Sequence, residues 1–463
     1  MKYLAVLGRQ PKISLAELES LFVNVRPIGA ELAEFESDKT PDIRRLGGTQ
    51  KISVKIDGSF QDFLKSLPMA GKLTIGVSDY SRGATAFKAQ GEALKIKRIL
   101  TKLGHSVRVV PNKTAALSSA TSFHNRLFAE NKIELIKVGK DFYRVIGVQN
   151  IDAYVKRDQA RPARDAKVGM LPPKLAQILI NLCGDLPAGT RLLDPFCGTG
   201  VVLQEAMLMG YMPYGTDLSE RMVEYSRKNL EWLLHSLACE GRHCRDTVSL
   251  SESSPAGRDS DPAQPDSQYL GQLTTPSTRQ ENAADVPGSL ARTSAASRQN
   301  SKILSTRGEE EEASACNDRP EELRFSEEKM GQILTSIDVT QGDATNFQWQ
   351  PPINAVACEG YLGRPMSLPP AEIKLKQEKQ ECGSIVLGFL KNLASQIQEG
   401  TPVVIAVPAW LRPNGEYERL NLLDEIKNLG YNVKSFRNLG QEDLLYHRDQ
   451  QVVAREIIVL RKK

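Results

Sequence analysis

Hydrophobic and polar positions along the first 70 residues follow two periods, and each predicts a different kind of element. Lys2–Gly8 is a short apolar run and Lys51–Ile56 alternates apolar with polar residues, so both predict strands. Between them, the segment from Ser14 to Phe22 predicts a helix, with Ser14 as its N-cap and Glu17 completing a capping box. Residues 1–70 are therefore expected to form a small α+β unit.

Residues 71–155 show the same mixture of periods and are expected to form a second α+β unit. A helix is predicted over Ala86–Leu103, where Gly104 ends it. Strands are predicted over residues 73–77, 106–110, 133–138 and 142–148, the last two joined by a turn at Gly139.

The pattern changes after a charged connector over residues 156–165. From Arg191 to Leu234 it reads strand, glycine loop, helix, strand, helix, which predicts a β-α-β unit of a parallel sheet. Residues from about 240 to 328 are polar, with few aromatic residues, and are expected to be a disordered insertion. The α/β pattern resumes at Ile337, so the fold class is α/β, with one domain over residues 156–463.

The charge of the chain is concentrated in one region. The overall net charge is +4, but residues 72–157 contain 16 Lys and Arg against 6 Asp and Glu, a local net charge of +10. A localised positive field suits a polyanion such as RNA, although a solvated basic surface is the alternative. The candidate RNA-binding residues are Lys88, Lys95, Lys97, Arg98, Lys102 and Arg126.

Three acidic residues are expected at the ends of three successive strands. Asp194 opens a loop with Gly198 and Gly200, whose glycines let the backbone approach a ligand near a helix N-terminus. Asp217 ends the next strand and is placed to accept from ribose hydroxyls, and Asp343 follows a third strand and can accept from an adenine amine. The chain has neither G-x-G-x-x-G nor a Walker lysine, so the pattern predicts a nucleoside site of another kind.

The run D-P-F-C-G-T-G at 194–200 is similar to the cofactor loop of class I methyltransferases that modify exocyclic amines of nucleic acids. Within that class the chain resembles the THUMP-containing tRNA guanosine N2-methyltransferases. The resemblance also rests on R-D at 157–158, R-P at 161–162, R-D at 164–165, G-M-L-P-P-K-L-A at 169–176, Y-H-R at 446–448 and V-A-R-E-I at 453–457.

The resemblance implies a Rossmann-like class I methyltransferase domain with S-adenosylmethionine as cofactor and tRNA as partner. It also implies a ferredoxin-like unit over residues 1–70, a THUMP-like RNA-binding domain over residues 71–155, and binding at the acceptor end of tRNA. The cofactor-binding residues are then Asp194, Pro195, Phe196, Cys197, Gly198, Thr199, Gly200, Asp217, Leu218, Asp343, Ala344, Met170 and Pro172.

The family's catalytic motif, Asp-Pro-Pro-Tyr, is altered in this chain. The aligned segment places Cys358 at the Asp position, followed by Glu359, Gly360 and Tyr361. We expect Glu359 to accept a hydrogen from the target amine and Tyr361 to stack on the flipped base. Cys358 is a poor acceptor, and its action as a covalent nucleophile toward a pyrimidine is a minor alternative.

Two rival functions follow from these departures. The altered motif is compatible with a catalytically silent RNA-binding protein that keeps the cofactor fold, and a methyltransferase acting on a small molecule or a protein is the other rival.

The seven cysteines contain no C-x-x-C pair, and no run of 18 apolar residues occurs. We therefore expect a cytoplasmic chain without a membrane span or a bound metal. His235, Cys239, His243 and Cys244 are interpreted as a fraying helix end rather than a zinc site.

Overall fold

Two β-sheets organise the computed structural model, and each takes its strands from one part of the sequence. The structure describes residues 1–69, 71–165, 171–246, 337–449 and 451–463. Residues 1–235 and 328–463 form one unit, and residues 236–327 form a second. Of the second unit only residues 236–246 are described, as the end of α8 (Glu220–Asp246). The expected insertion at 240–328 thus lies almost entirely outside the described residues.

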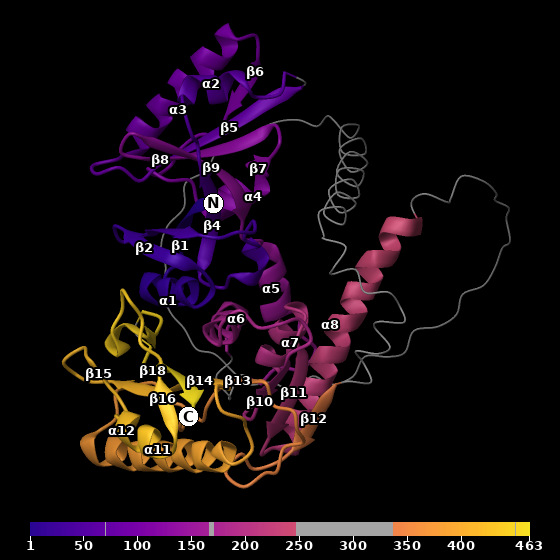
Figure 1. Cartoon of the computed structure of the whole chain (residues 1–463), viewed down its shortest axis with the longest axis vertical. Coiled ribbons are helices and arrows are strands. Elements are labelled where there is room, and N and C mark those ends of the chain that lie inside the picture. Colours follow the sequence, from indigo (N-terminus) through magenta and orange to yellow (C-terminus); the bar gives the residue numbers. More distant parts are fainter. Residues whose placement is uncertain (70, 166–170, 247–336, 450) are drawn as a thin grey trace, which may run out of the picture. The chain divides into compact units, whose positions relative to one another are not determined.

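The first sheet combines strands from both of the expected α+β units (Figure 1). Strand β4 pairs antiparallel with β9, with Ser53 opposite Val145, and this pair joins the two groups of strands. The strands in spatial order are β2 (Val23–Ile28), β3 (Leu32–Glu36), β1 (Lys2–Leu7), β4 (Thr49–Lys55), β9 (Asp141–Val148), β8 (Lys132–Val138), β5 (Lys72–Asp79) and β6 (Ser106–Val109), and β7 (Phe128–Ala129) pairs with β8. The strands predicted over residues 73–148 and the one beginning at Lys2 are confirmed.

Five α-helices are described in the same part of the chain. They are α1 (Pro11–Leu21), α2 (Phe60–Lys65), α3 (Ala86–Lys102), α4 (Ser119–His124) and α5 (Ile151–Gln159), with a short 3₁₀ helix at Ile43–Arg45. The helix predicted over Ala86–Leu103 is confirmed as α3, and the Thr85 side chain caps it by accepting from the Lys88 N–H. Helix α5 covers the first part of the expected charged connector, so that segment is not an extended linker.

The predicted capping box in α1 is wrong. The helix begins at Pro11, whose ring fixes the backbone in a helical conformation for the first turn, so Ser14 lies inside the helix. The Glu17 carboxylate instead accepts hydrogen bonds from the backbone N–H groups of Gly47 and Gly48, each at 2.9 Å. It also accepts from the side-chain amide of Asn181, at 2.8 Å. Glu17 is completely buried and joins α1 to a helix of the second sheet.

The second sheet is doubly wound and mostly parallel. Its strands in spatial order are β12 (Asp338–Gln341), β11 (Met212–Asp217), β10 (Arg191–Asp194), β13 (Ala355–Glu359), β14 (Pro402–Leu411), β18 (Val453–Lys462) and β16 (Tyr431–Val433). The strands from β12 to β14 run parallel, whereas β18 is antiparallel to both β14 and β16. Short strands β15 (Tyr417–Glu418) and β17 (Leu445–Tyr446) pair with β14 and β18. This is a Rossmann-like sheet with one reversed strand, as expected for a class I methyltransferase fold.

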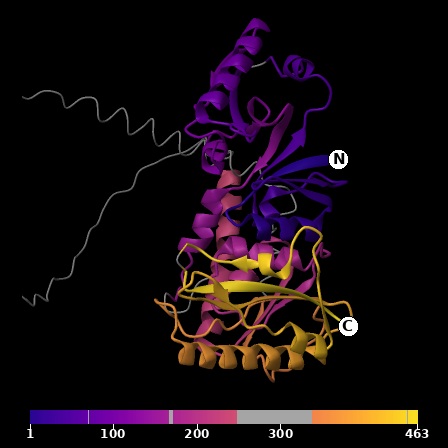
Figure 2. The same ribbon diagram turned by 90° about the vertical axis from the view of Figure 1, so that its left-hand side faces the viewer.

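Helices cover both faces of this sheet. Residues of α6 (Pro173–Leu182) and α7 (Val201–Leu208) share one buried cluster with Leu192, Ala355 and Val404. Residues of α11 (Glu372–Ala394) and α12 (Leu423–Asn428) share another with Val356 and Ile405. Figure 2 shows α11 running along its face of the sheet. Among the described residues, no helix is long and apolar enough to cross a membrane.

Glu17 provides a test of the contact between α1 and α6. Burial raises the pKa of Glu17 to about 7 from an ordinary value near 4.5. The folded protein then holds this proton more strongly than the unfolded chain, so stability is highest below about pH 4.5 and falls as the pH rises to about 7. We expect the free energy of unfolding to fall by up to about 3 kcal/mol across this window, relative to Glu17→Gln, which cannot ionise.

Urea unfolding at a series of pH values measures the effect. Glu31→Gln, at an exposed position, serves as the control and should unfold in parallel with the wild-type protein. A constant difference between wild type and Glu17→Gln from pH 4.5 to 7.5 would contradict the proposed proton uptake.

Candidate functional site

The glycine loop between β10 and α7 adopts backbone conformations that favour glycine. Gly198 and Gly200 have φ angles of 52° and 80°. A Cβ added at Gly200 would lie 2.9 Å from the Ser226 hydroxyl oxygen and 3.1 Å from the Ser226 Cα. A side chain here would therefore strain the backbone and displace α8. The sequence predicts a glycine turn before the N-terminus of α7, and the structure has this turn, with Gly200 as the N-cap of the helix.

Two buried polar residues of α8 hold this loop from behind. The Ser226 hydroxyl donates to the Gly198 carbonyl at 2.8 Å, and the Asn229 amide donates to the Thr199 carbonyl at 2.8 Å and to the Ala163 carbonyl at 2.9 Å. Both side chains are fully buried. The sequence interpretation missed them, although polar residues three apart on an otherwise apolar helix face were a usable signal.

Asp194 and Asp217 both lie at the loop. Asp194 is 2% exposed, and its carboxylate accepts from the Phe196 backbone N–H at 3.1 Å. The Asp217 carboxylate accepts from the backbone N–H groups of Gly198 and Ser219, each at 2.9 Å. Burial raises the pKa of both groups, that of Asp194 well above its ordinary value, and the Asp217 charge raises the Asp194 pKa further. The structure therefore brings these two predicted residues together.

Asp343 follows β12 next to the end of β11. The Gly342 backbone N–H donates to the Asp217 carbonyl at 2.9 Å, which fixes the two strand ends side by side. The Asp343 carboxylate accepts from the Thr345 backbone N–H at 2.9 Å and from its hydroxyl at 2.7 Å. The three predicted carboxylates thus follow three neighbouring strands, β10, β11 and β12.

The apolar members of the predicted cofactor set fall into three groups. Leu218 is 70% exposed directly after Asp217, so an aromatic base lying there would cover it. Pro195, Cys197 and Ala344 are buried in the wall of the site, whereas Phe196 and Pro172 are half-buried. Met170 lies outside the described residues.

These residues fit S-adenosylmethionine. Gly198 and Gly200 let the backbone turn tightly before α7, Asp217 and Asp343 carry carboxylates that suit a ribose and an amine, and Leu218 offers an apolar surface. A cofactor with a sulfonium and an ammonium group also matches the acidic character of the site. The residues that would hold it are thus on adjacent strand ends of one sheet.

The connector residues pack against the same loop. The Arg157 guanidinium pairs with the buried carboxylate of Glu205 at 2.7 Å, and Arg161 donates to the Thr199 hydroxyl at 3.4 Å. Both arginines come from the motif segments quoted for the resemblance. Arg161 thus contacts the glycine loop and Arg157 contacts the helix α7 that follows it, positions that the spacing of the two arginines could not show.

The altered catalytic motif lies at the end of β13. Cys358 is completely buried between β10 and β14, and burial raises the pKa of its thiol well above the ordinary value. This burial does not support the hypothesis that Cys358 attacks a pyrimidine. Glu359 is the last residue of β13, just as Asp194 is the last residue of β10, so each of these strands ends in a carboxylate. The guanidinium of Arg455 on β18 donates from Nε to the Glu359 carboxylate.

Tyr361 begins the loop that follows. It is half-buried, and its hydroxyl donates to the Glu381 carboxylate of α11 at 3.4 Å. The roles expected for Glu359 and Tyr361 stay predictions, and Arg455 is a neighbour of the site that the sequence interpretation used only as part of a motif.

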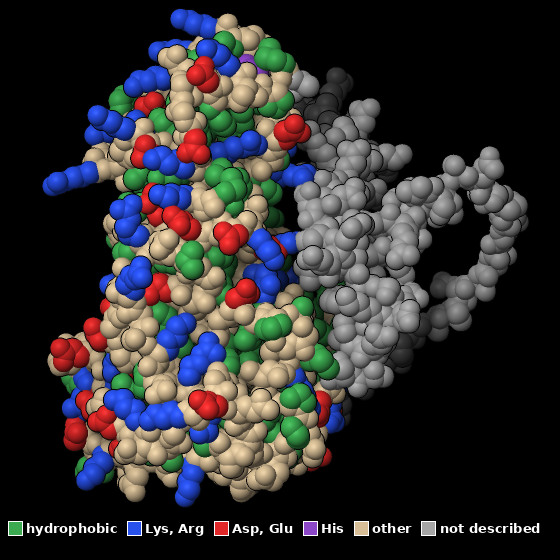
Figure 3. All heavy atoms as spheres, in the orientation of Figure 1, with side chains coloured by type: hydrophobic (Ala, Val, Ile, Leu, Met, Phe, Trp, Pro, Cys, Tyr) green, Lys and Arg blue, Asp and Glu red, His purple; other side chains and the backbone are tan. Residues whose placement is uncertain are grey.

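The candidate RNA-binding residues lie mostly on α3. Lys88, Lys95, Arg98 and Lys102 are exposed, while Lys97 and Arg126 are half-buried. Some of their charge is already engaged, because Lys88 donates to the Gly83 carbonyl at 2.8 Å and Lys95 lies 3.6 Å from Glu92. On the face in Figure 3, Lys and Arg side chains are spread among other types rather than gathered in one patch.

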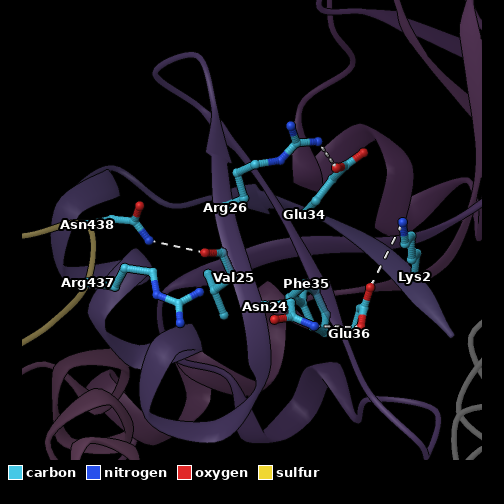
Figure 4. Close-up of a pocket in the computed structure, with 9 residues that line it drawn as sticks. All are labelled: Lys2, Asn24, Val25, Arg26, Glu34, Phe35, Glu36, Arg437 and Asn438. Carbon is cyan, nitrogen blue, oxygen red and sulfur yellow. Dashed lines mark hydrogen bonds and ion pairs between the residues drawn. The ribbon is translucent and has the colours of Figure 1, made fainter.

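A pocket of about 620 Å³ lies apart from this site, on β2 and β3 with Arg437 and Asn438 at its border (Figure 4). Its lining charges pair with one another. Arg26 lies 2.5 Å from Glu34, and Lys2 lies 4.0 Å from Glu36. The pocket therefore adds no group to the candidate site.

Comparison with known proteins agrees with the site. Residues 161–238 match the family of RMKL-like methyltransferase domains. The tRNA (guanine(10)-N2)-dimethyltransferase of Methanothermobacter thermautotrophicus is 50% identical over 76 residues, which are 16% of this chain and 22% of that protein. Its counterpart from Pyrococcus abyssi is 48% identical over 62 residues, 13% of this chain and 18% of that protein. The chain thus spans less than a quarter of the length of these two relatives.

Two solved structures are also similar. TrmN from Thermus thermophilus covers 100% of both chains with 14% identity and a TM-score of 0.39. The rRNA methyltransferase aviRa from Streptomyces viridochromogenes covers 64% of this chain and 88% of its own, with 14% identity and a TM-score of 0.28.

Residues 161–238 are thus similar to a methyltransferase domain, which agrees with the class expected from the sequence. The expected resemblance to the tRNA guanosine N2-methyltransferases is confirmed as well. S-adenosylmethionine is the methyl donor of such a domain.

Asp217→Ala tests the assignment of the cofactor site. The substitution removes the acceptor expected for the ribose hydroxyls, and it also removes the hydrogen bonds that the Asp217 carboxylate accepts from the backbone N–H groups of Gly198 and Ser219. We expect the dissociation constant for S-adenosylmethionine to rise about 10- to 100-fold with little change in melting temperature. Isothermal titration calorimetry measures it, with Glu224→Ala on the exposed face of α8 as control. Unchanged affinity in Asp217→Ala would show that the ribose binds elsewhere.

Proposed function

We propose that this protein transfers methyl groups from S-adenosylmethionine to the exocyclic N2 amine of a guanosine in tRNA. The 50% identity to a protein named tRNA (guanine(10)-N2)-dimethyltransferase carries the proposal. The strand-end carboxylates support it, because Asp217 contacts the glycine loop, Asp343 follows the neighbouring strand β12 and Glu359 ends β13. A local net charge of +10 over residues 72–157 supports a nucleic acid as the partner.

The domain assignment belongs to the same proposal. We propose a ferredoxin-like unit over residues 1–70, a THUMP-like RNA-binding domain over residues 71–155 and the methyltransferase domain over residues 156–463, with the cytoplasm as the expected location. Lys88, Lys95, Lys97, Arg98, Lys102 and Arg126 are the proposed RNA contacts. Binding should therefore weaken steeply as salt concentration rises.

The chemical task of the site follows from the weak nucleophilicity of the guanine amine. Its lone pair is delocalised into the ring, and S-adenosylmethionine supplies an electrophilic methyl group when bound. In the proposed mechanism, a Glu359 oxygen accepts a hydrogen bond from the amine N–H and so directs the lone pair toward that methyl group. As the new N–C bond forms and the bond from the methyl group to sulfur breaks, Glu359 takes the proton that the amine loses. Tyr361 stacks on the flipped base and holds it in line.

Glu359→Ala tests this role. We expect single-turnover methyl transfer to unmodified tRNA to fall about 100-fold, within the usual range for loss of a positioned acid–base group. Binding of S-adenosylmethionine should stay within about twofold of wild type, because Glu359 lies outside the glycine loop. Transfer of labelled methyl groups, followed by mass spectrometry of the digested nucleosides, measures rate and product together.

The outcomes separate the rival functions. Product at N2 of guanosine from the wild-type protein supports the proposal. Binding of tRNA without any label transfer would instead indicate a silent RNA-binding protein. Salt-insensitive tRNA binding together with methylation of another substrate would favour the small-molecule or protein methyltransferase.

A further inference from the structure

Arg455 and Glu359 are brought together across a strand that lies between them. Glu359 ends β13, which pairs with β14, and Arg455 lies on β18, which pairs with β14 from the other side. In register, Glu359 is opposite Ala406, and Ala406 is opposite Ile457, two residues from Arg455. Alternation along β18 puts Arg455 and Ile457 on the same face as Glu359. The small side chain of Ala406 leaves the path across β14 open.

The hydrogen bond between Arg455 and Glu359 uses one nitrogen of the guanidinium and one oxygen of the carboxylate. The Arg455 Nε donates to one Glu359 oxygen, Oε1. Among the described residues no hydrogen bond to the second oxygen, Oε2, is recorded. The Arg455 and Glu359 side chains are 6% and 15% exposed, so solvent screens the pair weakly. A planar guanidinium bound through Nε limits the rotamers of its partner while leaving one acceptor oxygen open.

We propose that Arg455 is a positioning residue, whose guanidinium holds the Glu359 carboxylate in one orientation with its second oxygen directed to the target amine. The inference rests on the proposed function, because it assigns to Glu359 the acceptor role described above. The family motif has an aspartate at the start of a rigid Pro-Pro turn. Here Gly360 removes that rigidity, and the longer glutamate side chain has more rotamers to lose, so an external clamp supplies the order.

The charges around Glu359 explain why the clamp is a cation. Asp194 on β10 and Glu359 repel each other, and the neighbouring Cys358 thiol is neutral in the core. Burial raises the pKa of Glu359, whereas the Arg455 charge and hydrogen bond lower it. Without Arg455 the buried carboxylate would take up a proton at a higher pH and lose its ability to accept from the amine.

The test is the pH profile of single-turnover methyl transfer to tRNA in Arg455→Met. An opposite charge at this distance shifts a carboxyl pKa by about one to three units. We expect the acidic limb of the Arg455→Met profile to move to higher pH by about one to three units. The rate of this variant should be at least about tenfold below wild type at pH 6.5 and partly restored at pH 9. Arg455→Lys keeps the charge but not the planar fork, so its limb should stay near that of wild type with a lower plateau.

The ion pair of Glu456, the residue after Arg455 on β18, provides a matched control. Arg419 pairs with Glu456 at 2.8 Å, so Arg419→Met breaks a similar partly buried ion pair on β18 outside the site. It should leave the shape of the profile unchanged. An equal loss of rate at every pH in Arg455→Met would mean a merely structural role and would overturn the inference. If Arg455→Met does not fold, a wild-type plateau in Arg455→Lys would also overturn it.

Glu359→Gln separates this inference from the proposed function. It should abolish the acidic limb in both the wild-type and the Arg455→Lys backgrounds. A Glu359→Gln protein with the full rate and the original limb would refute the acceptor role itself, whatever Arg455 does. A limb that vanishes in Glu359→Gln but does not move in Arg455→Met would refute only the positioning role.

Discussion

The candidate site depends on the parallel pairing of β10, β11, β12 and β13. In parallel strands the carboxyl ends meet at one edge, so residues far apart in sequence arrive there together. Register fixes the order, with Asp194 opposite Gly215 and Asp217 opposite Gln341. A shift of one residue in β10, β11 or β13 would turn the carboxylate at the end of that strand to the opposite face of the sheet.

Parallel pairing also concentrates like charges, and the structure offsets this cost with hydrogen bonds from fixed groups. Backbone N–H groups donate to Asp194 and Asp217, and a guanidinium donates to one oxygen of Glu359. Burial still raises the pKa of all three carboxyls. A cationic cofactor would relieve part of this repulsion, so the carboxylates that share this edge of the sheet favour its binding electrostatically.

The sequence predicted the parts of this arrangement that depend on local pattern. The glycine loop, the acids at strand ends and helix α3 follow from periodicity and from residue types that suit a turn. Contacts between distant segments could not be predicted in the same way. Ser226 and Asn229 act through their position on α8, and Glu17 has the spacing of a capping box but is used to join Gly47, Gly48 and Asn181. The end of β13 at Glu359 depends on its pairing with β14, which no local pattern fixes.

The loop after β13 shows how tertiary contacts can replace a rigid residue. Proline would restrict the backbone by itself, whereas Gly360 adds conformational freedom that must be lost on ordering. Helix α11 restrains the loop instead, since the buried Glu378 carboxylate accepts from the Arg364 backbone N–H at 3.3 Å and Glu381 accepts from the Tyr361 hydroxyl. Gly363, with a φ of 80°, lets the chain pass close to Glu378, where a Cβ would lie 2.6 Å from the carboxylate. Order in this loop therefore comes from α11, and order at the end of β13 comes from Arg455 of β18, rather than from the loop's own sequence.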